Sequence, residues 1–116
     1  MLLLEEFKEI VKIANGEFKE IVGFFEWTPK CPNGRDCYGQ AIEIQVRRCP
    51  NGKFEARPNC YTRTNNEIFK YPRNRFKNSI GDAVKDCVEQ FQKNMRGIND
   101  TFWEKDNDWL KHALLD

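Results

Sequence analysis

The stretch from Ala41 to Tyr61 carries the strongest structural signal in this chain. Two runs of alternating residues, 41–49 and 53–61, flank the tripeptide Pro50-Asn51-Gly52. Alternation on both sides of such a loop predicts a β-hairpin. Because a one-residue slip would exchange the two faces, the register of this hairpin decides which side chains lie together.

The apolar residues select the register. A two-residue turn at Asn51-Gly52 would set apolar residues of the first strand against polar residues of the second. A three-residue loop from Pro50 to Gly52, with Gly52 in a left-handed conformation, places Cys49 opposite Lys53 and makes one face apolar throughout. That face consists of Ile42, Ile44, Val46, Ala56, Pro58 and Cys60. The other face, which we expect to be wetter, consists of Glu43, Gln45, Arg47, Glu55, Arg57 and Asn59.

Further strands are expected on both sides of the hairpin. Pro58 cannot donate a backbone hydrogen bond, so the second hairpin strand is predicted to be an edge strand. Residues 17–27 are rich in Phe, Ile, Val and Trp and predict a strand that precedes the hairpin after a loop at 28–40. Apolar residues on both faces of 17–27 indicate a strand that is central or covered on both sides. Residues 67–71 are a candidate for one more short strand.

The N-terminal segment 3–14 has helical periodicity and ends at Asn15-Gly16. Its acidic side does not suit an anionic bilayer, so we expect a helix that packs on the core. The apolar side of this segment consists of Leu3, Leu4, Phe7, Ile10, Val11 and Ala14.

Two more helices are predicted after the strands. Ser79 with Asp82 resembles a capping box, and the helix it opens ends at Gly97. Its apolar stripe consists of Ile80, Ala83, Val84, Cys87, Val88, Phe91 and Met95. Thr101 with Glu104 predicts the start of a last helix. The buried face of that helix would consist of Phe102, Trp103, Trp109, Leu110, Ala113 and Leu114.

These elements predict one α+β domain over residues 1–116: an N-terminal helix, a three-stranded antiparallel meander and two C-terminal helices, in the order α-β-β-β-α-α. The chain has nine Phe, three Trp and three Tyr, enough apolar area to form a core without disulfides or a metal. No apolar run approaches the roughly 20 residues of a membrane span. Residues 1–4 are too short for a signal peptide, so we expect a cytoplasmic protein.

Charge is segregated along the chain although the net charge is only +1. Residues 47–77 contain nine basic and two acidic residues, whereas each flank contains eight acidic and five basic residues. A basic patch of this kind attracts acidic partners, and chance clustering in a loop-rich region is the alternative.

The first functional hypothesis is therefore a non-enzymatic binding module that engages an acidic partner, either nucleic acid or an acidic protein surface. Phe69 is expected to serve core packing rather than contact. The candidate binding residues are Arg47, Arg57, Tyr61, Arg63, Lys70, Tyr71, Arg73, Arg75 and Lys77.

The second hypothesis is a stand-alone protein-interaction module or inhibitor that occludes the surface of a partner protein, as a monomer or a homodimer. The predicted last helix carries Trp103, Trp109 and Leu114, more apolar surface than a terminal helix usually exposes.

The five cysteines suggest a metal site, because Cys31-Pro-Asn-Gly recurs as Cys49-Pro-Asn-Gly. The spacing lacks the close cysteine pairs of structural zinc sites. The predicted register also places Cys49 about 23 Å from the other end of its strand. We therefore expect no metal and no cofactor, with Cys60 and Cys87 as core residues. A three-cysteine site from Cys31, Cys37 and Cys60 is the fallback.

Catalytic patterns are sparse. The single histidine, His112, lies near the C-terminus, and no phosphate-binding glycine loop is present. A helix followed by three strands and a helix also occurs in metal-dependent nucleases, for which Asp36, Glu43 and Glu55 would be the acids, and in double-stranded-RNA-binding domains. The basic residues before Ser79 fit the latter, but the lysine-rich turn of that class is missing. We therefore assign no family and expect no enzyme.

Overall fold

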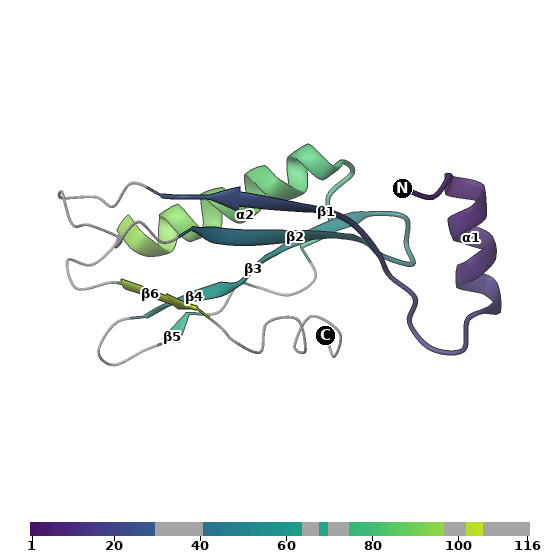
Figure 1. The fold of residues 1–116 in the computed structure, drawn as a ribbon, viewed down its shortest axis with the longest axis horizontal. Helices are drawn as coiled ribbons and strands as arrows, with labels where there is room; N and C mark the ends of the chain where they lie inside the picture. Colours follow the sequence, from purple (N-terminus) through teal and green to yellow (C-terminus); the bar gives the residue numbers. More distant parts are fainter. Residues whose placement is uncertain (30–40, 64–67, 70–74, 97–101, 106–116) are drawn as a thin grey trace.

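The computed structural model describes residues 1–29, 41–63, 68–69, 75–96 and 102–105, with side chains for 1–29, 41–60 and 75–93. Helix α2 (Ile80–Arg96) covers one face of a three-stranded antiparallel sheet with the order β1-β2-β3. A second small sheet has the order β5-β4-β6, and helix α1 (Leu4–Ile13) stands at one end of the molecule (Figure 1). The α+β class and the meander are confirmed.

The hairpin has the predicted register. Strand β2 (Ile42–Arg48) pairs with β3 (Phe54–Pro58), and Val46 lies opposite Ala56. The Cys49 N–H donates to the Lys53 carbonyl oxygen at 2.8 Å, which closes the three-residue loop. Gly52 has a φ of +80°, the left-handed conformation that the loop requires.

Strand β1 (Glu20–Trp27) pairs only with β2 among the described residues, so the prediction that it is central or covered on both sides is wrong. Its apolar residues are divided between a core contact and solvent. Trp27 packs edge-on against Phe91 of α2, with ring centroids 5.3 Å apart. Phe24 and Ile21 are exposed. The edge position predicted for β3 from Pro58 is confirmed within the described sheet.

The core lies between α2 and the apolar face of the sheet. The Ser79 Oγ accepts a hydrogen bond from the Asp82 N–H at 3.1 Å, so the predicted cap of α2 is confirmed. Cys60 and Cys87 are buried in the core, also as predicted. The buried core consists of Ile42, Ile44, Val46, Ala56, Cys60, Ala83, Cys87 and Phe91. Ile80, Val84 and Val88 of the predicted stripe pack at its margin.

The second face of the sheet is not wet, which corrects the sequence expectation. Gln45, Arg47, Glu55 and Asn59 are buried there, whereas Glu43 is exposed. Burial of charged groups is possible because Arg47 and Glu55 form an ion pair across β2 and β3. Alternation of apolar and polar residues therefore predicted the two faces correctly but not their exposure.

The chain after Pro58 departs from the predicted hairpin and from the predicted last helix. The Asn59 N–H donates to the Glu43 carbonyl oxygen at 2.9 Å, and the chain then enters β4 (Cys60–Arg63) of the second sheet. Cys60 therefore pairs with Lys105 rather than facing Ile42.

Strand β4 pairs on one side with β5 (Ile68–Phe69) and on the other with β6 (Phe102–Lys105). The last helix was expected to begin at Thr101, so that prediction is wrong for 102–105. A Phe-Trp pair is favourable in strands, and pairing with β4 outweighs the local capping signal. The remainder of the predicted helix lies outside the described residues.

Helix α1 is confirmed as a helix but not as a fully packed one. Phe7 is buried and its ring lies 5.9 Å from the ring of Phe18, whereas Leu3 and Leu4 of the predicted apolar side are exposed. The radius of gyration, 15.6 Å, exceeds the roughly 13 Å of a compact chain of this length. Within the described residues, neither helix has the length and apolar character that a membrane crossing requires.

Candidate interaction surfaces

The predicted basic surface is only partly assembled by the fold. Arg47 is 2% exposed and donates from Nη2 to Glu55 Oε1 at 2.5 Å, so its charge is used inside the protein. Arg57 is half-buried on β3. Tyr61 and Arg63 belong to β4, whose side chains at these positions are not described. Lys70, Tyr71 and Arg73 lie outside the described residues.

Arg75 and Lys77 meet an acid on α2. Arg75 donates from Nε and Nη2 to the two oxygens of Asp86, at 2.7 and 2.6 Å. Lys77 Nζ lies 3.8 Å from the same carboxylate. A bidentate arginine–carboxylate contact is geometrically specific, and it fixes the segment before α2 to the helix. These two predicted binding residues therefore have an intramolecular role in the structure.

A charged cluster occupies the buried polar face of the main sheet. Lys19 Nζ, from the segment that precedes β1, lies 3.4 Å from Glu55 Oε1 and 3.6 Å from Glu17 Oε1. Glu55 thus forms ion pairs with both Lys19 and Arg47. With Glu17 included, the cluster has two cations and two carboxylates, so its charges balance. The cluster ties the segment that precedes β1 to strand β3 across the polar face of the sheet.

Arg48 connects helix α1 to the sheet. Its guanidinium lies 5.0 Å from the ring centroid of Phe7 and 5.7 Å from that of Phe54. Arg48 Nε also lies 3.7 Å from Glu20 Oε1, and Glu20 Oε2 accepts a hydrogen bond from the Leu2 N–H at 2.7 Å. Cation–π contacts of this kind contribute about 0.5–2 kcal/mol each. The sequence placed Arg48 in the basic segment, but its contacts anchor α1.

The three described cysteines are buried free thiols. Burial, together with the nearby Glu55 carboxylate, raises the pKa of Cys49 to about 11. Burial raises the pKa of Cys60 to about 12 and that of Cys87 still further. High pKa values keep these thiols protonated near neutral pH, so they are poor nucleophiles and poor ligands.

No group of three or more His, Cys, Asp or Glu residues that could hold a metal ion occurs in the described part of the chain. The fallback ligands Cys31 and Cys37 lie outside it. Of the acids considered for a nuclease, Glu55 is paired internally, Glu43 is exposed, and Asp36 is not among the described residues.

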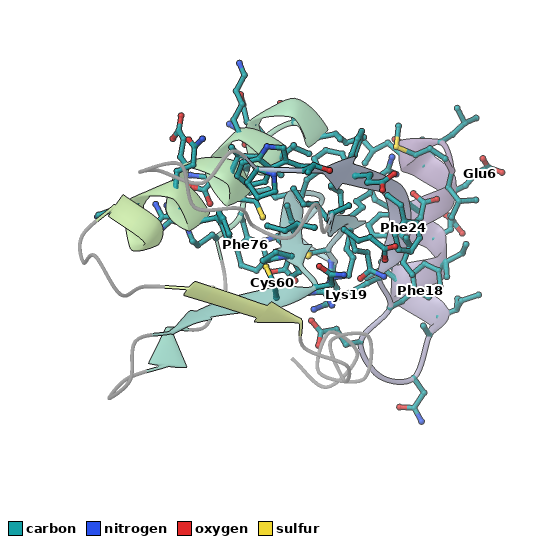
Figure 2. The ribbon with its side chains drawn as sticks, turned by 60° about the vertical axis from the view of Figure 1, so that its left-hand side comes forward. Glu6, Phe18, Lys19, Phe24, Cys60 and Phe76 are labelled. Carbon is teal, nitrogen blue, oxygen red and sulfur yellow. The ribbon has the colours of Figure 1, made fainter. Side chains whose placement is uncertain are left out.

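Exposed apolar side chains are concentrated at the N-terminal part of the protein. On α1 and before it, the exposed residues are Met1, Leu3, Leu4 and Ile13. On β1 they are Ile21, Phe24 and Phe25. Figure 2 shows Phe18, Lys19 and Phe24 along the stretch that leads from α1 into β1. We call the seven exposed residues the N-terminal apolar surface.

Sequence reasoning missed this surface because it expected Leu3, Leu4 and the apolar residues of 17–27 to be packed, and it gave Met1 and Ile13 no role. The signal was present in the imperfect alternation of 17–27, where apolar residues point to both sides of the strand. Such a pattern is typical of a strand covered on both faces, but it is equally typical of an edge strand that binds another chain.

In the comparisons with known proteins, no family model matches this chain, and neither a curated protein nor a solved structure matches it. The functional interpretation therefore depends on the surfaces described above.

Proposed function

We propose that this protein is a non-enzymatic protein-interaction module that binds another protein through the N-terminal apolar surface. The observation that carries this proposal is the position of the exposed large hydrophobic residues: among the described side chains, all seven fall within residues 1–25. They lie on or before α1 and on both faces of β1, and exposed apolar area of this extent is typical of a docking surface.

The electrostatic contacts support the same interpretation. Arg47 and Arg75, two of the predicted binding residues, form ion pairs within the protein. A charge that already has a buried or bidentate partner contributes little to the recognition of a second one. The basic charge of these two residues is therefore less available for binding than the exposed apolar area.

A capture experiment with the full chain as bait in an extract of its native host tests this proposal. The replacements Leu3→Glu with Leu4→Glu on α1, and separately Phe24→Lys on β1, should abolish capture of the specific partner. Gln92→Glu, at an exposed position of α2, adds one negative charge elsewhere and is the matched control. Retention of every partner by both apolar-surface variants would contradict the proposal.

Binding of an acidic partner through the basic segment remains a second prediction, since Lys70, Tyr71 and Arg73 lie outside the described residues. Salt distinguishes the two modes. Apolar binding should persist at about 1 M salt, where the Debye length is about 3 Å, whereas binding to nucleic acid should weaken steeply. A titration with generic duplex and single-stranded nucleic acid tests this mode, and no binding at low salt would remove the nucleic-acid version.

A further inference from the structure

The two edges of the main sheet are protected to different degrees. On β3, Pro58 lacks an N–H donor, and Phe54 exchanges two backbone hydrogen bonds of 2.8 Å with Lys77. Strand β1 contains no proline, and no described residue other than those of β2 pairs with it. In Figure 1, β2 and β3 lie between β1 and the second sheet, so β1 forms the outer edge. Natural proteins usually protect an apolar edge strand of this length.

A β-bulge gives β1 an unusual distribution of side chains. Ile21 pairs with Arg47 and Gly23 with Val46, so that Val22 is the extra residue. Val22 packs against the core. Gly23 lies opposite Val46, so it is also on the core side. Two successive residues therefore lie on the core side, and the alternation of faces restarts after them.

The restart makes the order of faces palindromic. Glu20, opposite Arg48, and Phe25, opposite Ile44, lie on the core side of the sheet. Ile21 and Phe24, opposite Arg47 and Gln45, lie on the polar side. Read from Glu20 to Phe25, the faces are core, polar, core, core, polar, core. Read from Phe25 back to Glu20, the order of faces is the same. The pattern is therefore symmetric about the point between Val22 and Gly23.

A strand with a palindromic order of faces is complementary to a second, antiparallel copy of itself. When Val22 faces Gly23 of the second copy, Ile21 faces Phe24, and both are on the polar side of one continuous sheet. Because side-chain face and hydrogen-bonding direction alternate together along a strand, this register also matches the outward-pointing N–H and C=O groups. Ile21 and Phe24 are 49% and 59% exposed, so this pairing would bury them.

The same register sets no like charges opposite each other. Lys19 would face Glu26 of the second copy, on the same polar side of the sheet. Glu26 is exposed, whereas the Lys19 ammonium extends over the sheet to Glu55 of β3. A shift by one residue would set residues of different faces against each other, such as Glu20 on the core side and Glu26 on the polar side, so it would break the match of faces.

We infer that the partner of the β1 edge is a second copy of this chain, which pairs antiparallel about a two-fold axis between Val22 and Gly23 and joins two main sheets into one of six strands. This inference rests on the proposed function and names the partner for the β1 part of the N-terminal apolar surface. A two-fold axis makes each contact occur twice, as in most homodimers. At the centre, Gly23 lies under the ring of Phe25 of its own chain, where an added Cβ would come within 3.0 Å of Phe25 Cε2.

Site-directed disulfide formation tests both the dimer and its register. The double replacement Ile21→Cys with Phe24→Cys places two thiols opposite each other across the interface, twice per dimer. Within one chain the bulge shortens this span, because Ile21 and Phe24 lie opposite Arg47 and Gln45, which are about 7 Å apart along β2 and so near the limit that a disulfide spans. A non-reducing gel separates a link between two chains from a link within one. Mild oxidation should convert the double variant into a covalent dimer on non-reducing gels. Trypsin should then release residues 20–30 linked to a second copy of the same peptide.

The wild-type protein and each single replacement, oxidised in parallel, control for the native cysteines and should remain unlinked at 20–30. Light scattering over a concentration series measures the unmodified dimer. Phe24→Lys should raise the dissociation constant about tenfold or more, because the change occurs twice. Gln92→Lys introduces a lysine at an exposed position of α2, outside the N-terminal apolar surface, and should leave the constant unchanged.

Two results would overturn the inference: a wild-type monomer up to about 1 mM, or a double variant that cross-links at 20–30 no faster than the single variants. The capture experiment then separates this failure from failure of the proposed function. A monomer that still captures a host protein, and loses it on Phe24→Lys, rejects self-pairing but keeps the interaction module. A monomer whose capture is insensitive to all apolar-surface replacements rejects both.

Discussion

Arg47 and Glu55 form an ion pair on the face of the sheet that the alternation of polar and apolar residues predicts to be exposed to solvent. Each side chain is nearly excluded from solvent, at 3% and 5% exposure. The removal of one partner from a buried ion pair leaves the other charge desolvated without compensation, which is far more costly than removal of an exposed charge. The part of the polar face around Arg47 and Glu55 is therefore a structural part of the domain rather than a surface.

Glu55→Gln should lower the free energy of unfolding by about 3 kcal/mol or more, because Arg47 and Lys19 would lose their common carboxylate. Urea denaturation followed by circular dichroism measures this change. Glu43→Gln makes the same replacement at an exposed position of β2 and should change stability by about 0.5 kcal/mol or less. Equal effects of the two variants would show that the face is solvated.

The buried thiols predict a loss of stability at alkaline pH. The pKa of Cys60 is raised from 9.0 to about 12 in the folded state, so the folded protein retains a proton that the unfolded chain releases. The stabilisation is complete below pH 9 and is lost as the pH rises toward 12, with a slope of up to about 1.4 kcal/mol per pH unit for each thiol.

Cys87→Ala removes one such thiol, and burial raises the pKa of Cys87 in the same direction. Between pH 9 and 11, the free energy of unfolding of this variant should fall less steeply than that of the wild type. Other groups that titrate in this range contribute equally to both proteins, so the difference in slope isolates the thiol. Parallel curves for the two proteins would contradict the burial of Cys87.

At the scale of elements, local backbone chemistry decides the hairpin and the start of α2. Gly52 has a φ of +80°, which side chains of L-residues rarely adopt, whereas Gly81 lies in the first turn of α2. A Cβ added at Gly81 would meet only the Ser79 Oγ, at 4.0 Å. The same substitution should therefore have opposite effects at the two positions.

Gly52→Ala should destabilise the protein by about 1–2 kcal/mol, the cost of a left-handed conformation with a Cβ. Gly81→Ala should stabilise it by about 0.5–1 kcal/mol, because alanine restricts the unfolded chain and suits a helix. Thermal unfolding of the two variants beside the wild type measures both effects. Destabilisation by Gly81→Ala, or tolerance of Gly52→Ala, would mean that the loop or the helix start differs from the structure.

At the scale of the whole molecule, α1 is held to the sheet by few contacts. Phe7 supplies its buried side chain, between the ring of Phe18 and the guanidinium of Arg48. A ten-residue helix is too short to be stable alone in water. The helical state of α1 therefore depends on this docking contact.

Phe7→Ala should release α1 while the core persists. In hydrogen exchange followed by mass spectrometry, amide protection over Leu4–Ile13 should fall toward that of an unfolded peptide, whereas β2 and α2 should keep their protection. Leu3→Ala, at an exposed position, is the control and should leave the protection of α1 unchanged. Equal loss of protection in α1 and β2 would show that α1 belongs to the cooperative core.

The sequence by itself determined the local structure of this protein. The Pro50-Asn51-Gly52 loop and the alternation of Ile44 and Val46 specify the hairpin register, because a slip of one residue would expose its apolar face. The Ser79 hydroxyl and the apolar stripe behind it specify α2 in the same way. These features depend on residues close together in the chain or on a single repeated period.

Only the tertiary structure decided which of these faces meets solvent. Strand β1 has apolar residues on both sides, but its place at the edge leaves Ile21 and Phe24 exposed, whereas the polar Arg47 is buried. The order of strands, the bulge at Val22 and the pairing of 102–105 with β4 all depend on contacts between distant segments. Because local periodicity carries no information about which segment covers which face, the candidate interaction surface emerged only from the assembled fold.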